Sequence, residues 1–119
     1  MLTGYYRTSD LGTVPRQALH AQGVPDEAIF TDFRRHHSVE LYRAVGILEA
    51  GDTVVLHSVW DLGPLPGDIE RFVEWVRRRQ VNVRIGNYLF DLADDLGVLM
   101  LRTLVSATQL LHATQRNAS

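Results

Sequence analysis

Apolar residues recur along the chain in short runs and in helical stripes, and the two patterns alternate. Met1 opens an apolar, aromatic and β-branched run that ends in the polar residues 7–10, which predicts a strand at the start of the chain. The clearest strand is predicted over 52–59, because its continuous apolar centre is typical of a parallel strand covered on both faces. Shorter strands are predicted over 28–32 and 81–86.

Helical patterns fill the intervals between these strands. Residues 15–23 are typical of a short helix, with Pro15 in its first turn and Gly23 at its C-terminal end. Further amphipathic helices are predicted over 38–51 and 68–79. The alternation predicts an α/β fold, a three-layer sandwich with a mostly parallel sheet of four to five strands.

The last segment is apolar around much of its circumference. Ten of the sixteen residues from Leu96 to Leu111 are apolar, and they form two stripes. A helix of this kind must be covered on two sides, so one stripe packs on its own sheet and the other needs a second chain. We therefore expect an isologous homodimer with Val98, Leu101 and Val105 at the interface. The alternative is a single central core helix. The other stripe consists of Leu96, Leu99, Met100, Leu104, Ala107 and Leu111.

Length and composition predict one ordered domain. The 119 residues are 45% hydrophobic and 22% charged, which suits a globular chain with a single core. We expect one domain over 1–119, with the sheet core at 1–91, the long helix at 92–117 and no separate DNA-binding domain. The sequence has neither a membrane-spanning run nor a signal peptide, so a cytoplasmic location without membrane partners is expected.

The charge pattern excludes several classes of chemistry. There is no cysteine, which excludes disulfides and thiolate catalysis, and all twelve basic residues are arginine. A net charge of −2 and a pI near 6.2 argue against a generally basic nucleic-acid binder, so any DNA contact would be local. The chain has no phosphate-binding Gly-rich motif, and its adjacent His36 and His37 lack a carboxylate at ligand spacing. We therefore expect no nucleotide cofactor, no metal site and no other cofactor.

Candidate chemistry lies where the first strand should end. In an open α/β sheet, ligands bind at the carboxyl ends of the strands. Arg7 and Ser9 fall there, as a phosphate-binding cation beside a candidate nucleophile. The alternative is that Ser9 and Asp10 form a turn or a helix N-cap. Arg34 and Arg35 follow the second strand and are weaker candidates for phosphate contacts.

The order of the short motifs resembles a known family. The sequence Gly-Tyr-Tyr-Arg-Thr-Ser at 4–9 resembles the Gly-Tyr-Xaa-Arg-Xaa-Ser opening of the serine recombinases, the resolvase and invertase family. Further landmarks follow in order at 16–23, 29–32 and 51–55, and the long C-terminal helix with Gly97 is similar to the family's dimer-forming helix. The resemblance implies a resolvase-like catalytic domain. It also implies that Ser9 attacks the scissile phosphodiester and joins the DNA 5′ phosphate, with Arg7 among the arginines that stabilise the charge.

The chain departs from the family pattern after the third strand. Where the family has Leu-Asp-Arg-Leu-Gly-Arg, this sequence has Trp60, Asp61 and Pro64 in place of the aspartate and the two arginines. A one-residue gap would restore the aspartate as Asp61 but neither arginine. Because losing one preorganised oxyanion donor costs roughly 10²–10³ in rate, losing two cations should cost well beyond 10³.

These departures favour a recombinase-like fold that has lost most of its reaction. The hypothesis is a domain related to site-specific DNA recombination that acts as a dimeric interaction or regulatory module, paired with itself or with an active recombinase. The alternative is an active DNA strand-transfer enzyme that uses Ser9 as nucleophile, with Arg34 and Arg35 supplying cations.

Overall fold

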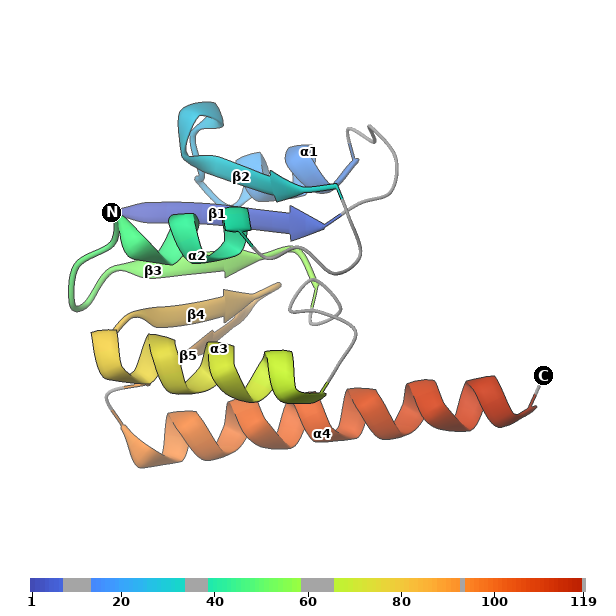
Figure 1. Cartoon of the computed structure of the whole chain (residues 1–119). Helices are drawn as coiled ribbons and strands as arrows, with labels where there is room; N and C mark the ends of the chain where they lie inside the picture. Colours follow the sequence, from blue (N-terminus) through green and yellow to red (C-terminus); the bar gives the residue numbers. More distant parts are fainter. Residues whose placement is uncertain (8–13, 34–38, 59–65, 93, 119) are drawn as a thin grey trace.

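The computed structural model describes residues 1–7, 14–33, 39–58, 66–92 and 94–118, and its centre is a five-stranded sheet (Figure 1). The strands lie in the order β2-β1-β3-β4-β5. The first four strands are parallel, and β5 runs antiparallel to β4. The fold is therefore α/β with a mostly parallel sheet, as the sequence predicts. The strands are β1 (Leu2–Arg7), β2 (Ile29–Asp32), β3 (Thr53–Leu56), β4 (Asn82–Ile85) and β5 (Tyr88–Phe90).

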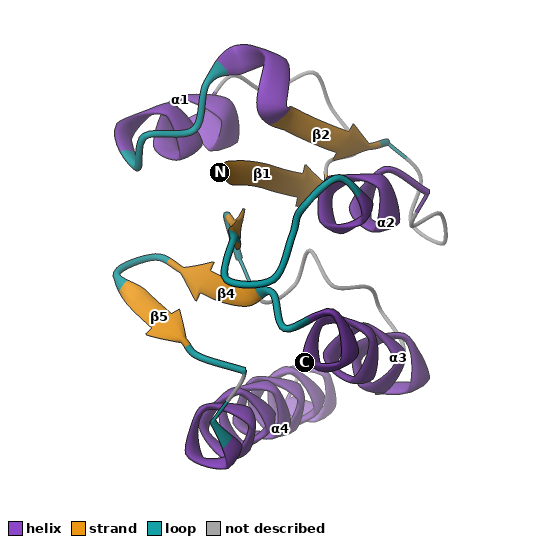
Figure 2. Ribbon diagram, turned by 90° about the vertical axis from the view of Figure 1, so that its left-hand side faces the viewer, coloured by secondary structure: helices purple, strands orange, loops and turns teal. Residues whose placement is uncertain are grey.

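Helices lie on both faces of this sheet (Figure 2). α1 lies on one face, α2 and α3 lie on the other, and α4 runs beside α3 and β5. The order of helices along the chain agrees with the order predicted from the apolar pattern. The helices are α1 (Val14–Ala21), the 3₁₀ helix η1 (Asp26–Ala28), α2 (Val39–Gly46), α3 (Pro66–Arg79) and α4 (Asp95–Ala118).

A two-residue hairpin reverses the chain between β4 and β5. Ile85 pairs with Tyr88, so Gly86 and Asn87 form the loop. Gly86 has a φ of 60°, which a residue without a side chain adopts at no steric cost at the first position of a type II′ turn. This Gly-Asn pair is a recognised hairpin signal, and it explains the fifth strand that the apolar pattern did not localise.

The two faces of the sheet have separate cores. The larger core joins α2, α3 and α4 to strand residues that include Tyr5, Leu56 and Val83. The smaller core lies under α1, where Leu19 packs with Tyr6 and Val55 and their neighbours. Because side chains alternate between the faces of a strand, Tyr5 and Tyr6 enter different cores.

The start of α4 is held very close to the segment that precedes it. Gly97 is buried, and a Cβ at this position would collide with the backbone carbonyl of Asp91. Val98 and Leu101 then continue into the larger core. A side chain at position 97 would therefore push α4 away from the sheet.

Candidate functional site at the carboxyl edge of the sheet

The four parallel strands end at one edge of the sheet, where ligands bind in open α/β folds (Figure 1). Arg7 ends β1, is half-buried, and lies in register with Asp32, which ends β2. The structure therefore places the predicted cation at the edge where the site was expected. Ser9, Arg34 and Arg35 lie outside the described residues.

A buried carboxylate joins three elements at this edge. Asp32 is 5% exposed, and its Oδ2 accepts a hydrogen bond from the Tyr5 hydroxyl at 2.7 Å. The backbone N–H groups of Glu40 and Leu41 donate to its two oxygens at 3.2 and 3.3 Å. The carboxylate thus binds the N-terminus of α2, where the helix dipole favours negative charge.

This arrangement fixes the ends of β1 and β2 relative to each other. Tyr5 is fully buried and stands two residues before Arg7 on the same face of β1. Sequence reasoning missed Asp32 because an acid after a strand is usually a turn residue. The available signal was a tyrosine in the buried part of β1, whose hydroxyl needs a partner once it leaves water.

A second, more exposed cluster lies on the α1 face. Arg16 donates to the Oδ1 of Asp26 at 2.7 Å, and His20 Nε2 lies 2.8 Å from the same oxygen. Hydrogen bonds from Arg16 and His20 hold the pKa of the Asp26 carboxyl below its usual range. Asp26, and the hydroxyl of Tyr6 after it, raise the pKa of Arg16. The cluster ties α1 to η1 and to β1.

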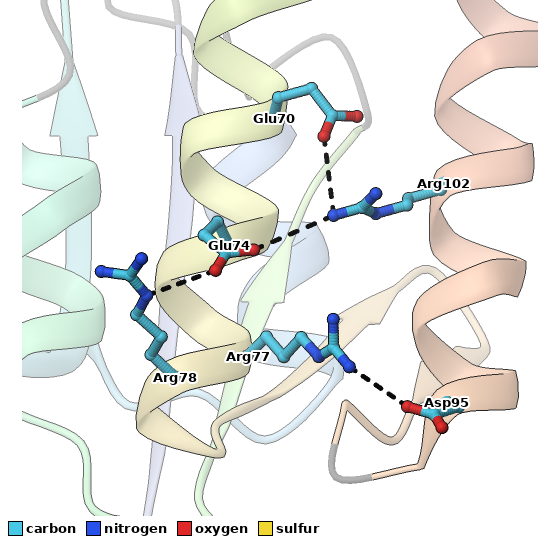
Figure 3. A network of polar contacts seen from close by, with 6 residues as sticks. All are labelled: Glu70, Glu74, Arg77, Arg78, Asp95 and Arg102. Carbon is cyan, nitrogen blue, oxygen red and sulfur yellow. Dashed lines mark hydrogen bonds and ion pairs between the residues drawn. The ribbon is translucent and has the colours of Figure 1, made fainter.

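The arginine run that ends α3 is held by acidic and carbonyl partners (Figure 3). Arg77 pairs with Asp95 of α4 at 3.2 Å, and Arg78 pairs with Glu74 at 3.3 Å. Arg79 donates to the carbonyls of Gly46, the last residue of α2, and Leu48, which follows it. These contacts give the run a structural role.

A further arginine bridges α3 and α4. Arg102 of α4 lies 3.6 Å from Glu70 and 4.0 Å from Glu74 on the facing side of α3 (Figure 3). Its Nε is buried without a hydrogen-bond partner in the described part of the chain. The seam between the two helices is therefore polar along its outer side.

In the first turns of α4 the residues of the two stripes have the opposite exposure from that expected, whereas Leu104 of the second stripe packs against the larger core. Val98 and Leu101 are 6% and 0% exposed and pack in the chain's own core, so these side chains are not available to a second chain. Leu96, Leu99 and Met100, from the other stripe, are 60%, 61% and 52% exposed. The reason for the correction is the close approach at Gly97, which turns the adjacent stripe toward the sheet. The side chain of Val105 lies outside the described residues.

Neither similarity to known proteins nor a metal-binding cluster in the described residues points to a function. No model of a known protein family matches the chain, and no curated protein matches it. Over the described ranges, no group of three or more histidine and acidic side chains is placed to hold a metal ion. In the same part of the chain, no helix combines the length and apolar character needed to cross a membrane.

Proposed function

We propose that this chain is a serine-recombinase-like domain that forms homodimers and works as an interaction module in DNA recombination, with its strand-transfer chemistry largely lost. The family assignment depends on the ordered motifs of the sequence. The position of Arg7 at the carboxyl end of β1 supports it, because that edge is where a phosphate would be held.

We infer the loss of strand-transfer chemistry from the partners that the arginines have in the structure. Phosphoryl transfer depends on several cations aimed at the transferring phosphate. Every helix arginine whose side chain the structure describes is instead bound to an acidic side chain or to backbone carbonyls at the C-terminal end of α2. The family's two arginines after the third strand are replaced here by Asp61 and Pro64. Within the described residues, the helix arginines are therefore not available to a transferring phosphate.

The exposed stripe of α4 supports the homodimer. Leu96, Leu99 and Met100 are each more than half exposed on one side of a 24-residue helix. Exposed apolar side chains arranged at helical spacing mark a contact with another protein. A two-fold arrangement of two copies would bury this stripe against the second copy.

The chemical half of the proposal is tested by looking for a covalent adduct. The protein is incubated with supercoiled and nicked plasmid that carries the DNA flanking its own gene, and a 5′-phosphoseryl adduct is sought after denaturation. We expect no adduct from the wild-type protein. An adduct that is absent from Ser9→Ala would overturn the loss of chemistry and support the alternative, an active enzyme with an altered arginine set.

The assembly half is tested with two equally exposed apolar residues. Leu99→Arg is expected to convert the dimer to a monomer in sedimentation equilibrium, because it buries a charge in the stripe. Val39→Arg is the matched control, since Val39 is 62% exposed on α2 and lies outside the stripe. A wild-type protein that is already monomeric would contradict the homodimer.

A further inference from the structure

The face of β4 and β5 that points toward the α1 side is open. Val83, Ile85 and Phe90 enter the larger core, so Arg84 and Leu89, which alternate with them, point to the opposite face. Arg84 lies in register with Val55 on one side and with Leu89 on the other. Val55 is buried in the small core, whereas Leu89 is 53% exposed.

This openness is unusual for a strand in a parallel ladder. Parallel strands are normally covered on both faces. In the described part of the chain, the small core contains residues from α1 to η1 and from β1 to β3, and none from β4 or β5. Figure 2 shows α1 beside β1 and β2, and none of the described helices lies over the same face of β4 and β5.

A cation without a partner lies on this open face. Arg84 is half-buried, and among the described residues it makes neither an ion pair nor a hydrogen bond. A guanidinium that has lost part of its water is stabilised by a carboxylate brought to it. Beside it, Leu89 offers apolar surface, so the face fits a partner that combines an acid with apolar side chains.

The same chain presents such a combination next to the open face. Half of the large exposed apolar side chains in the described residues lie between 88 and 100, on β5 and the first turns of α4. Asp94 is exposed at the start of α4, and its Oδ1 accepts the N–H of Leu96, which leaves Oδ2 for another donor. The acid and the apolar stripe are therefore continuous with the surface proposed for the dimer.

We infer that in the homodimer the start of α4 from a second copy covers the open face of β4 and β5, with Arg84 paired to Asp94 of that copy. The inference rests on the proposed homodimer and adds the residue pair that sets its register. Because an isologous interface repeats every contact, each dimer contains two Arg84–Asp94 pairs. The pairs supply specificity, while the stripe of α4 supplies the apolar area.

A double-mutant cycle on the dimerisation constant tests this pairing. Arg84→Gln removes the cation, and Asp94→Asn removes the charge but keeps the oxygen that caps α4. We expect each single variant to raise the dimer Kd by about tenfold, because two ion pairs are lost at once. The dimer Kd of the double variant should lie within about twofold of the Kd of either single variant. Arg43→Gln removes an exposed arginine on α2 and should leave the Kd unchanged.

The outcomes separate this inference from the proposed function. Sedimentation equilibrium at several salt concentrations gives each Kd, and circular dichroism confirms that every variant is folded. If the wild type dimerises and Arg84→Gln behaves like Arg43→Gln, the pairing is overturned and the homodimer stands. If the single effects simply add, the two residues do not meet, and the pairing is likewise overturned. If the wild type is monomeric, the homodimer fails and this inference fails with it.

Discussion

On one face of the sheet α2, α3 and α4 pack over all five strands, whereas on the other face α1 packs over β1, β2 and β3 alone. A carboxylate on each face joins a helix to a strand or to the adjoining turn. Asp32 is buried on the larger face, and Asp26 is exposed on the smaller one. The difference shows that, within the described residues, helices cover all five strands on one face and only β1 to β3 on the other.

The largest expected effect compares one leucine from each core. Leu101 and Leu19 are both fully buried, so Leu→Ala removes the same apolar groups from water. We expect Leu101→Ala to cost about 4 kcal/mol and Leu19→Ala about 3 kcal/mol, because the enclosed core collapses less around a cavity. Chemical denaturation measures both. An equal or larger cost for Leu19→Ala would contradict the contrast between the faces.

The second prediction tests the contact that closes the larger face. Gly97→Ala should destabilise the fold by about 3 kcal/mol, since its Cβ meets the Asp91 backbone carbonyl, which is not a flexible group. Gly46→Ala is the matched control at a helical glycine with open space around it, and it should cost nothing. Thermal unfolding measures the stability of both variants. Similar melting temperatures would show that α4 does not approach the Asp91 backbone as closely as described.

The third prediction compares the two carboxylates. Asp32→Ala should cost about 2 kcal/mol, because it removes a buried acceptor shared by the Tyr5 hydroxyl and two amide groups of α2. Asp26→Ala should change the free energy of unfolding far less, because its partners are exposed to water. Urea denaturation at neutral pH measures the two changes. A larger loss of stability for Asp26→Ala than for Asp32→Ala would contradict the difference between a buried and an exposed carboxylate.

The smallest expected effect is the pH dependence of the exposed link. The pKa of Asp26 is lowered in the folded state by Arg16 and His20. Its contribution to stability is therefore complete above the pKa of the unfolded chain and is lost as the pH falls through the lowered value. NMR titration of the carboxyl should show the lowered pKa, and Asp26→Asn should remove this part of the acid sensitivity. A midpoint at the ordinary value for aspartate would contradict the Arg16 contact.

The order of elements could be read from the sequence because each rests on a local pattern. The run at 53–56 and the helical spacing of α2 and α3 depend on neighbours in the chain, and the structure confirms these elements, although α2 ends at Gly46 and not at 51 as predicted. β5 was not localised because three residues make a weak pattern. The Gly86-Asn87 turn was the stronger signal.

The role of each stripe of α4 could not be read in the same way. A helical stripe shows that apolar side chains share a side, but not which chain covers them. Gly97 was the missing information, because a residue without a Cβ marks the side of closest backbone approach. Asp32 was likewise hidden, since its partner Tyr5 is 27 residues away in the sequence.

The short hairpin at Gly86 also decides the direction of the longest helix. β4 ends at the carboxyl edge, and β5 carries the chain back, so that α4 begins near the opposite edge and runs the length of the sheet (Figure 1). Without those three residues of return, the helix would start beside the loops and point away from the body. Its final turns instead run past the carboxyl edge of the sheet, so that the C-terminus lies at the opposite end of the molecule from the N-terminus (Figure 1).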